Sequence, residues 1–226
     1  MNRVAALLID ILLIFPLSAS PYCIFQPPKN WEIAQPKVPT PYVQIGFLGE
    51  AKNGFRSCLN LAIEEQVDVS LKQYVKAVKK LQTKDHKKKW LDLGALSMVA
   101  GPGHLIEMTE ESPWGELKIL QAFYVQNKTA YILTASLLKE DYIGFQKEIV
   151  SAFKTFQLTD TLWTPIVDAI QRDHFRTLYS SLGTSESEVE WQTFQKAVAD
   201  LNDLGPYWQF QALQSGKEKI YPEEKK

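Results

Sequence analysis

Three histidines, His86, His104 and His174, are the side chains best suited to acid–base chemistry or metal binding near neutral pH. His86 lies in a lysine-rich run, His104 follows a glycine turn, and His174 lies in a segment with helical periodicity. This spacing does not resemble that of a shared metal site. His104 and Glu107 would share the face of a helix, but on a strand a separation of three residues turns them to opposite faces. We therefore predict no metal site.

Short catalytic motifs are absent from the sequence. It contains no G-x-S-x-G nucleophile turn, no P-loop, no dinucleotide-binding glycine pattern and no H-E-x-x-H helix. The sequence therefore predicts no catalytic residue and no cofactor-binding residue. An enzyme without a short motif, using His104, Glu107 and Asp141, is kept as an alternative.

Aromatic and charged clusters are the candidate binding residues, because interfaces concentrate aromatic side chains beside charge. A lysine run near residue 87 could approach an anionic partner, or be only a solvated loop. Acidic residues surround an aromatic side chain near residue 114, in a predicted hairpin tip. The candidates are Lys87, Lys88, Lys89, Glu110, Glu111, Trp114, Tyr207, Trp208 and Phe210.

The overall charge of the chain is close to neutral. It carries 25 Lys and Arg against 26 Asp and Glu, with a pI near 6.3. No electrostatic attraction to nucleic acid is encoded, so we expect no nucleic-acid partner. The partner is expected to be another envelope protein or a small ligand.

Residues 1–20 have the anatomy of a signal peptide, with Arg3 before an apolar stretch and small residues after it. The apolar stretch is shorter than the roughly 20 residues that span a bilayer as a helix. We therefore expect an exported protein of the periplasm or cell envelope, with membrane contact only through this segment. An uncleaved anchor, or a lipoprotein with the lipid on Cys23, remains an alternative.

Cys23 and Cys58 are the two cysteines of the chain. In an oxidising compartment the only intramolecular disulfide possible joins these two residues. Two buried free thiols are the alternative.

Alternating and helical periodicities predict an α+β fold. A long helix is expected over 71–81 and a second over 140–156, with a turn and a meander of antiparallel strands between them. Helical periodicity over 165–179 and 188–204 predicts a C-terminal helical hairpin. The strands of the meander are predicted over 104–109, 117–125 and 130–136, and three further strands over 42–48, 55–65 and 90–99.

Several short segments resemble the PsbP-like superfamily, including its DcrB-type bacterial envelope proteins. The segments are Pro28–Trp31, Val43–Phe47, Cys58–Glu65, Ala130–Ala135 and Phe153–Phe156. The resemblance implies a PsbP-like α/β/α sandwich, in which helices cover an antiparallel sheet, and a role in binding or assembly without catalysis.

The resulting division of the chain has four parts. These are a signal peptide over 1–20, a PsbP-like domain over 24–158, a helical appendage over 159–213 and a flexible tail over 214–226. We expect an exported, non-catalytic binding or assembly protein of the bacterial cell envelope. The alternatives are a small-ligand carrier with an apolar pocket between sheet and helices, and the enzyme without a motif.

Overall fold

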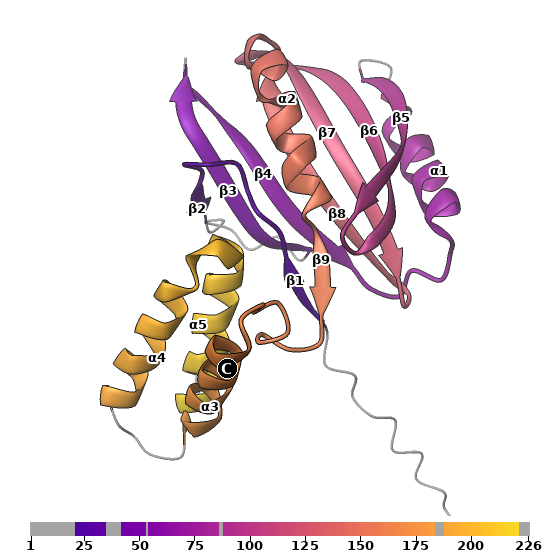
Figure 1. Ribbon diagram of the computed structural model, residues 1–226. Helices are drawn as coiled ribbons and strands as arrows, with labels where there is room; N and C mark the ends of the chain where they lie inside the picture. Colours follow the sequence, from indigo (N-terminus) through magenta and orange to yellow (C-terminus); the bar gives the residue numbers. More distant parts are fainter. Residues whose placement is uncertain (1–20, 35–41, 53, 86–87, 184–187, 222–226) are drawn as a thin grey trace, which may run out of the picture.

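The computed structural model describes residues 21–34, 42–52, 54–85, 88–183 and 188–221 (Figure 1). The predicted signal peptide and Lys87 lie outside these residues. An antiparallel sheet carries one helix on each face, and further helices follow at the C-terminal end. The predicted α+β fold class is confirmed.

The main sheet has seven strands among the described residues, in the order β2-β3-β4-β8-β7-β6-β5. Strands β6 to β8 form the predicted antiparallel meander, and β5 pairs with β6 and extends it by one strand. Strand β5 forms one edge of the sheet. The bounds are β2 Glu32–Ala34, β3 Val43–Lys52, β4 Phe55–Glu64, β5 Lys89–Met98, β6 Gly101–Ser112, β7 Gly115–Gln126 and β8 Thr129–Leu138.

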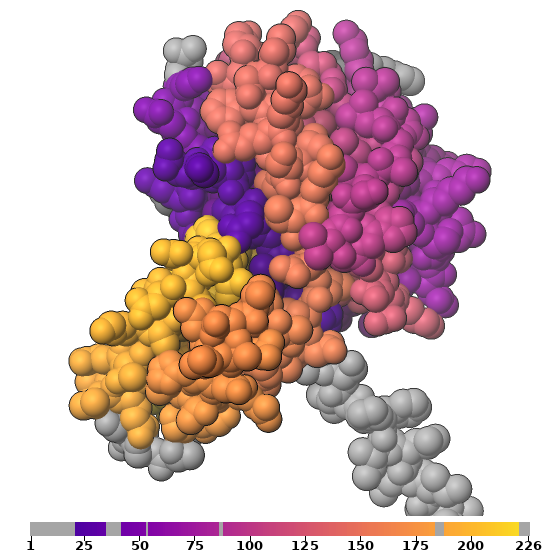
Figure 2. Space-filling view, in the orientation of Figure 1, coloured from indigo at the N-terminus to yellow at the C-terminus, as the bar shows by residue number. Residues whose placement is uncertain are grey.

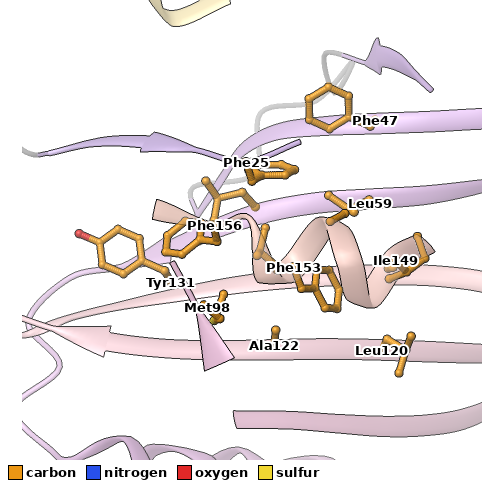
Figure 3. Packing of buried hydrophobic residues seen from close by; sticks show 14 of the residues in the cluster. Phe25, Phe47, Leu59, Met98, Leu120, Ala122, Tyr131, Ile149, Phe153 and Phe156 are labelled. Carbon is orange, nitrogen blue, oxygen red and sulfur yellow. The ribbon is translucent and has the colours of Figure 1, made fainter. Parts of the chain in front are cut away.

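Helix α2 (Lys139–Lys154) covers one face of this sheet. Its apolar residues Ile149 and Phe153 are completely buried, and they pack on strand residues such as Leu59 and Leu120 (Figure 3). In β4, every second residue from Ser57 to Leu61 is buried, which is the period of two expected of a strand with one face on a core. This packing forms the main core of the protein.

Helix α1 (Leu71–Gln82) lies over β6 and β7 on the opposite face. Ser70 caps its first turn by accepting a hydrogen bond from the Gln73 amide, while the Gln73 side chain bonds back to the Ser70 amide. Tyr74 and Val75 are buried in a second apolar cluster with Phe123. The two helices therefore make the α/β/α layers expected from the sequence.

The C-terminal region holds three α-helices among the described residues, rather than the predicted hairpin of two. They are α3 (Ala169–Ser181), α4 (Glu188–Asp200) and α5 (Pro206–Ile220), with a short 3-10 helix η1 (Asn202–Leu204) before α5. Figure 2 shows them as a lobe beside the sheet body. No described helix is long and apolar enough to cross a membrane.

The tail predicted to be flexible from residue 214 is helical as far as Ile220, which corrects that prediction. Gly216 lies within this segment, and it allows α5 to pack closely against α4. A Cβ atom at this position would lie 2.7 Å from the Phe194 ring and 3.1 Å from the Trp191 ring. The absence of a side chain therefore serves packing here. Residues 222–226 lie outside the described part of the chain.

Strand β1 (Tyr22–Ile24) joins the two parts of the molecule. It pairs with β9 (Gln157–Thr159), the strand that leads from α2 toward the C-terminal helices. The Gln211 side chain of α5 bonds both the amide and the carbonyl of Cys23. The first described strand is thus held by the last described helix.

Candidate functional site

A groove of about 570 Å³ lies between helix α1 and strands β5 and β6. This volume lies within the range of small-molecule sites. Helix α1 packs over β6 and β7, so β5 extends beyond it and leaves the groove between them. We name this hollow the α1–β5 groove. It is lined by Leu71, Lys72, Val75, Lys76, Lys79, Asp92, Ala95, Gly103 and His104.

The walls of the groove are apolar and its rim is basic. Leu71 and Val75 contribute apolar surface from α1, and Ala95 contributes it from β5. The lysines line it from positions 72, 76 and 79, separations of four and three residues that place them along one side of the helix. Lysine side chains present apolar stems and keep the ammonium group in solvent. The groove thus offers an apolar lining, and cationic groups lie along its mouth.

The one carboxylate that lines the groove is already bonded. Asp92 Oδ1 lies 2.8 Å from His104 Nε2 and also accepts a hydrogen bond from the Gly94 amide at 2.9 Å. Gly94 has a φ of 86° and lies at a bulge, where the register between β5 and β6 shifts. The bulge therefore positions Asp92 to hold His104, which leaves the lysines as the unbonded charges of the groove.

The sequence revealed the lysines of α1 but not the groove. The sequence places these lysines opposite the apolar positions of the predicted 71–81 helix, a spacing that is typical of a solvated helix face. Whether a strand extends beyond the helix depends on the strand order of the sheet, which places β5 at an edge. Only the tertiary structure supplies that order.

The predicted basic and acidic clusters meet rather than forming two separate surfaces. Lys88 Nζ lies 2.7 Å from Glu110 Oε2, because the start of β5 lies beside the end of β6. Trp114, at the β6–β7 turn, is 54% exposed and packs against the Phe55 ring at 5.7 Å between centroids. Glu111 and Lys89 are exposed nearby on these strands. Because Lys88 and Glu110 pair, each cluster has less net charge with which to attract a partner.

The aromatic segment near residue 208 is part of the core, not an exposed surface. Tyr207 is 5% exposed and packs on Phe25, while Trp208 is completely buried. Phe210 is half-buried against the main core. The segment lies at the start of α5, where it connects the C-terminal helices to the sheet. The completely buried Trp208 therefore serves packing, whereas a binding role for Tyr207 and Phe210, which line a hollow beside α5, stays a prediction.

The two cysteines are free thiols, and they lie on opposite sides of the sheet. Cys23 packs in the core beneath α2. Cys58 lies on β4 opposite Ser136 of β8. Its neighbour Leu59 faces α2, and successive side chains of a strand alternate, so Cys58 points to the other face of the sheet. A disulfide between them would have to cross the sheet. Cys23 is only 2% exposed. The lipoprotein alternative stays a prediction.

We expect neither thiol to react rapidly with Ellman's reagent in the native protein at pH 8. Burial raises the pKa of Cys23 to about 12 and also raises the pKa of Cys58, and only the thiolate is the nucleophile. In guanidinium chloride both thiols should react, and a Cys23→Ala variant should then show one equivalent of reactive thiol instead of two. A stoichiometric reaction of the native protein within seconds would contradict this burial.

A buried polar network lies on the α2 face, away from the groove. Glu107 is 9% exposed, and its two carboxylate oxygens bond Lys118 Nζ at 2.8 Å and the Tyr142 hydroxyl at 2.5 Å. Lys118 Nζ also donates to the Thr109 hydroxyl, and the Gln146 amide donates to the Tyr142 oxygen. Burial and the Glu107 carboxylate raise the pKa of Tyr142. These groups satisfy one another, as a structural network does.

The residues of the enzyme alternative do not meet. His104 bonds Asp92 at the groove, whereas Glu107 bonds Tyr142 on the opposite face, as the strand spacing predicted. Asp141 forms an ion pair with Lys52 at 2.7 Å. Among the described residues, no group of three His, Cys, Asp or Glu side chains could hold a metal ion. No catalytic constellation is therefore assembled from His104, Glu107 and Asp141.

A second hollow, of about 340 Å³, lies between α3 and α4. Its lining includes His174 and Gln171 from α3, and Lys196 and Asp200 from α4. Both signs of charge are present in this lining, so it favours no one charge of ligand. The α1–β5 groove is the more selective site, because its unbonded charges are all cations.

Comparison with known proteins gives similar structures but no family. No protein-family model matches the chain, and no curated protein matches it. The DcrB-type subgroup therefore stays a prediction.

Solved structures similar to the chain come from several kinds of protein. LpqN of Mycobacterium tuberculosis, involved in cell envelope biogenesis, is 11% identical over 62% of this chain and 84% of its own, with a TM-score of 0.48. The cyanobacterial PsbP of Synechocystis is 12% identical over 62% of this chain and 93% of its own, at 0.43. The Saccharomyces cerevisiae Ran-binding protein Mog1p is 14% identical over 53% of this chain and 84% of its own, with a TM-score of 0.32. A PsbP protein is thus among the similar structures.

Proposed function

We propose that this protein is an exported, non-catalytic binding or assembly protein of the bacterial cell envelope, and that it binds its partner in the α1–β5 groove. The groove combines an apolar lining with a row of cations at its rim. Such a combination recognises a partner through burial and charge, and it needs no reactive group.

The single observation that supports this proposal is the composition of the groove. Its one carboxylate, Asp92, is bonded to His104, and the remaining charged groups are lysines on α1. A hydrolytic cleft would be expected to set a Ser, Thr or Cys nucleophile beside such an Asp–His pair, and the lining of the groove holds none. The PsbP-like resemblance of the sequence supports the same class of function.

Export is proposed from the N-terminal sequence, where an apolar stretch with signal-peptide anatomy precedes the first described strand. The test is the intact mass of the native protein together with fractionation of its own cells. We expect a mass reduced by about 20 residues, and recovery in the soluble envelope fraction. Full-length protein in the cytosol would overturn the export proposal.

The same groove supports a second candidate function, a small-ligand carrier. Its position between sheet and helix, and the apolar contribution of Leu71, Val75 and Ala95, suit an apolar ligand. The two functions differ in the occupant of one site, so one set of binding measurements separates them.

A further inference from the structure

We infer that the occupant of the α1–β5 groove is an extended, acidic segment of a partner protein. The inference rests on the proposed binding function and specifies its partner. The segment would place apolar side chains on the lining of the groove and carboxylates at its basic rim.

The charge of the groove favours an acidic occupant. Lys72, Lys76 and Lys79 form no ion pair with any carboxylate among the described residues, and all three are exposed. The nearest acid in the lining, Asp92, is bonded to His104 and to the Gly94 amide. The mouth is therefore a positive strip on a chain whose net charge is −1.

The length of this strip favours a peptide over a single anionic headgroup. From residue 72 to residue 79, a helix that rises 1.5 Å per residue extends by roughly 10 Å. An extended chain covers that length with about three residues, at roughly 3.3 Å each. Since side chains alternate along an extended chain, three carboxylates on one face need about five residues. A segment of that length could meet all three lysines, whereas one headgroup would lie near only one or two of them.

The edge strand gives an extended segment a place to lie. Among the described residues, β5 pairs only with β6, so its other side has no strand partner. The bulge at Asp92–Gly94 interrupts its first half, whereas Ala95–Met98 continue in regular register beyond it. A short segment beside Ala95–Met98 would form main-chain hydrogen bonds with the free edge of β5 and reach the groove. This is the geometry of strand addition.

The test uses the full folded chain and two fluorescent probes. One probe is a short peptide of alternating valine and glutamate, and the other is dodecanoate, which carries an apolar tail and one charge. The first variant replaces the groove lysines: Lys72→Gln, Lys76→Gln and Lys79→Gln. The control variant removes the same charge from exposed lysines outside the groove: Lys80→Gln, Lys147→Gln and Lys154→Gln.

We expect the peptide to bind saturably and more weakly at high salt, because exposed charges are screened. The groove variant should weaken this binding about tenfold, and the control variant should change it less than about twofold. A peptide with lysine in place of glutamate should not bind.

Three outcomes would overturn the inference, and they differ in what they imply for the proposed function. If dodecanoate binds in the groove and the peptide does not, the partner is a small ligand, and the groove is still a binding site. If neither probe binds, both the acidic segment and the groove as binding site are wrong. Equal weakening by the control variant would show that net charge, not the groove, attracts the peptide.

Discussion

Replacing Trp208 with alanine is expected to lower the free energy of unfolding by about 3–5 kcal/mol, the usual cost of removing a large buried aromatic side chain. Trp208 is completely buried among the C-terminal helices, and its ring centroid lies 5.3 Å from that of Phe175. Its indole Nε1 donates a hydrogen bond to the Leu162 carbonyl at 2.8 Å. The substitution would leave both a cavity and an unbonded buried carbonyl.

Chemical denaturation followed by circular dichroism measures this loss. Trp114→Ala is the matched control, because Trp114 is 54% exposed at the β6–β7 turn. We expect that variant to lose less than about 1 kcal/mol, as surface substitutions usually do. Similar losses in the two variants would mean that Trp208 is not a core residue.

Replacing Glu107 with leucine is expected to cost about 2–4 kcal/mol, because it leaves the Lys118 ammonium without its carboxylate. The Lys118 side chain is 21% exposed, so solvent relieves part of the penalty. The Tyr142 hydroxyl loses its acceptor in the same change. A double variant, Glu107→Leu with Lys118→Met, should recover much of the loss, because it removes the unpaired charge as well.

An exposed ion pair serves as the control for the effect of burial on the free energy of unfolding. Lys128 and Asp68 are 3.3 Å apart, and their side chains are 70% and 79% exposed. Asp68→Asn should therefore change the free energy of unfolding by less than about 0.5 kcal/mol. If Glu107→Leu were equally mild, the network would be a surface pair and not a buried one.

The sequence predicted the sheet and its two covering helices because their periodicities are strong and local. In β4 the buried residues alternate, and in α1 the residues that pack in the apolar cluster, Leu71, Tyr74, Val75 and Val78, recur at helical spacing. The opposite orientations of His104 and Glu107 also followed from strand geometry alone. Local patterns of this kind need no knowledge of distant contacts.

The C-terminal region was predicted less well, because its decisive contacts are tertiary. The helix predicted over 188–204 ends at Asp200, and Gly205 and Pro206 begin a third helix after it. Gly216 has the composition of a loose segment, yet it packs against Trp191 and Phe194. The buried state of Trp208 likewise depends on residues distant in sequence, so exposure was the wrong expectation for it.

The candidate site was the least predictable feature. The lysines of α1 were visible as a solvated face, and the groove beside them exists because β5 lies at the sheet edge. The Lys88–Glu110 pair also arises from the β5–β6 register, which joins two clusters that were treated separately. Strand order and register therefore decide which charged residues remain available to bind a partner.

Chemical-shift mapping of the isotope-labelled full chain, titrated with the valine–glutamate peptide, tests the central claim most directly. If the α1–β5 groove is the binding site, the shifted amides should cluster at 71–79, at Asp92 and Ala95, and at Gly103 and His104. The Trp114 turn and the α3–α4 hollow should stay unchanged. Shifts confined to either of those regions would contradict the assignment of the groove.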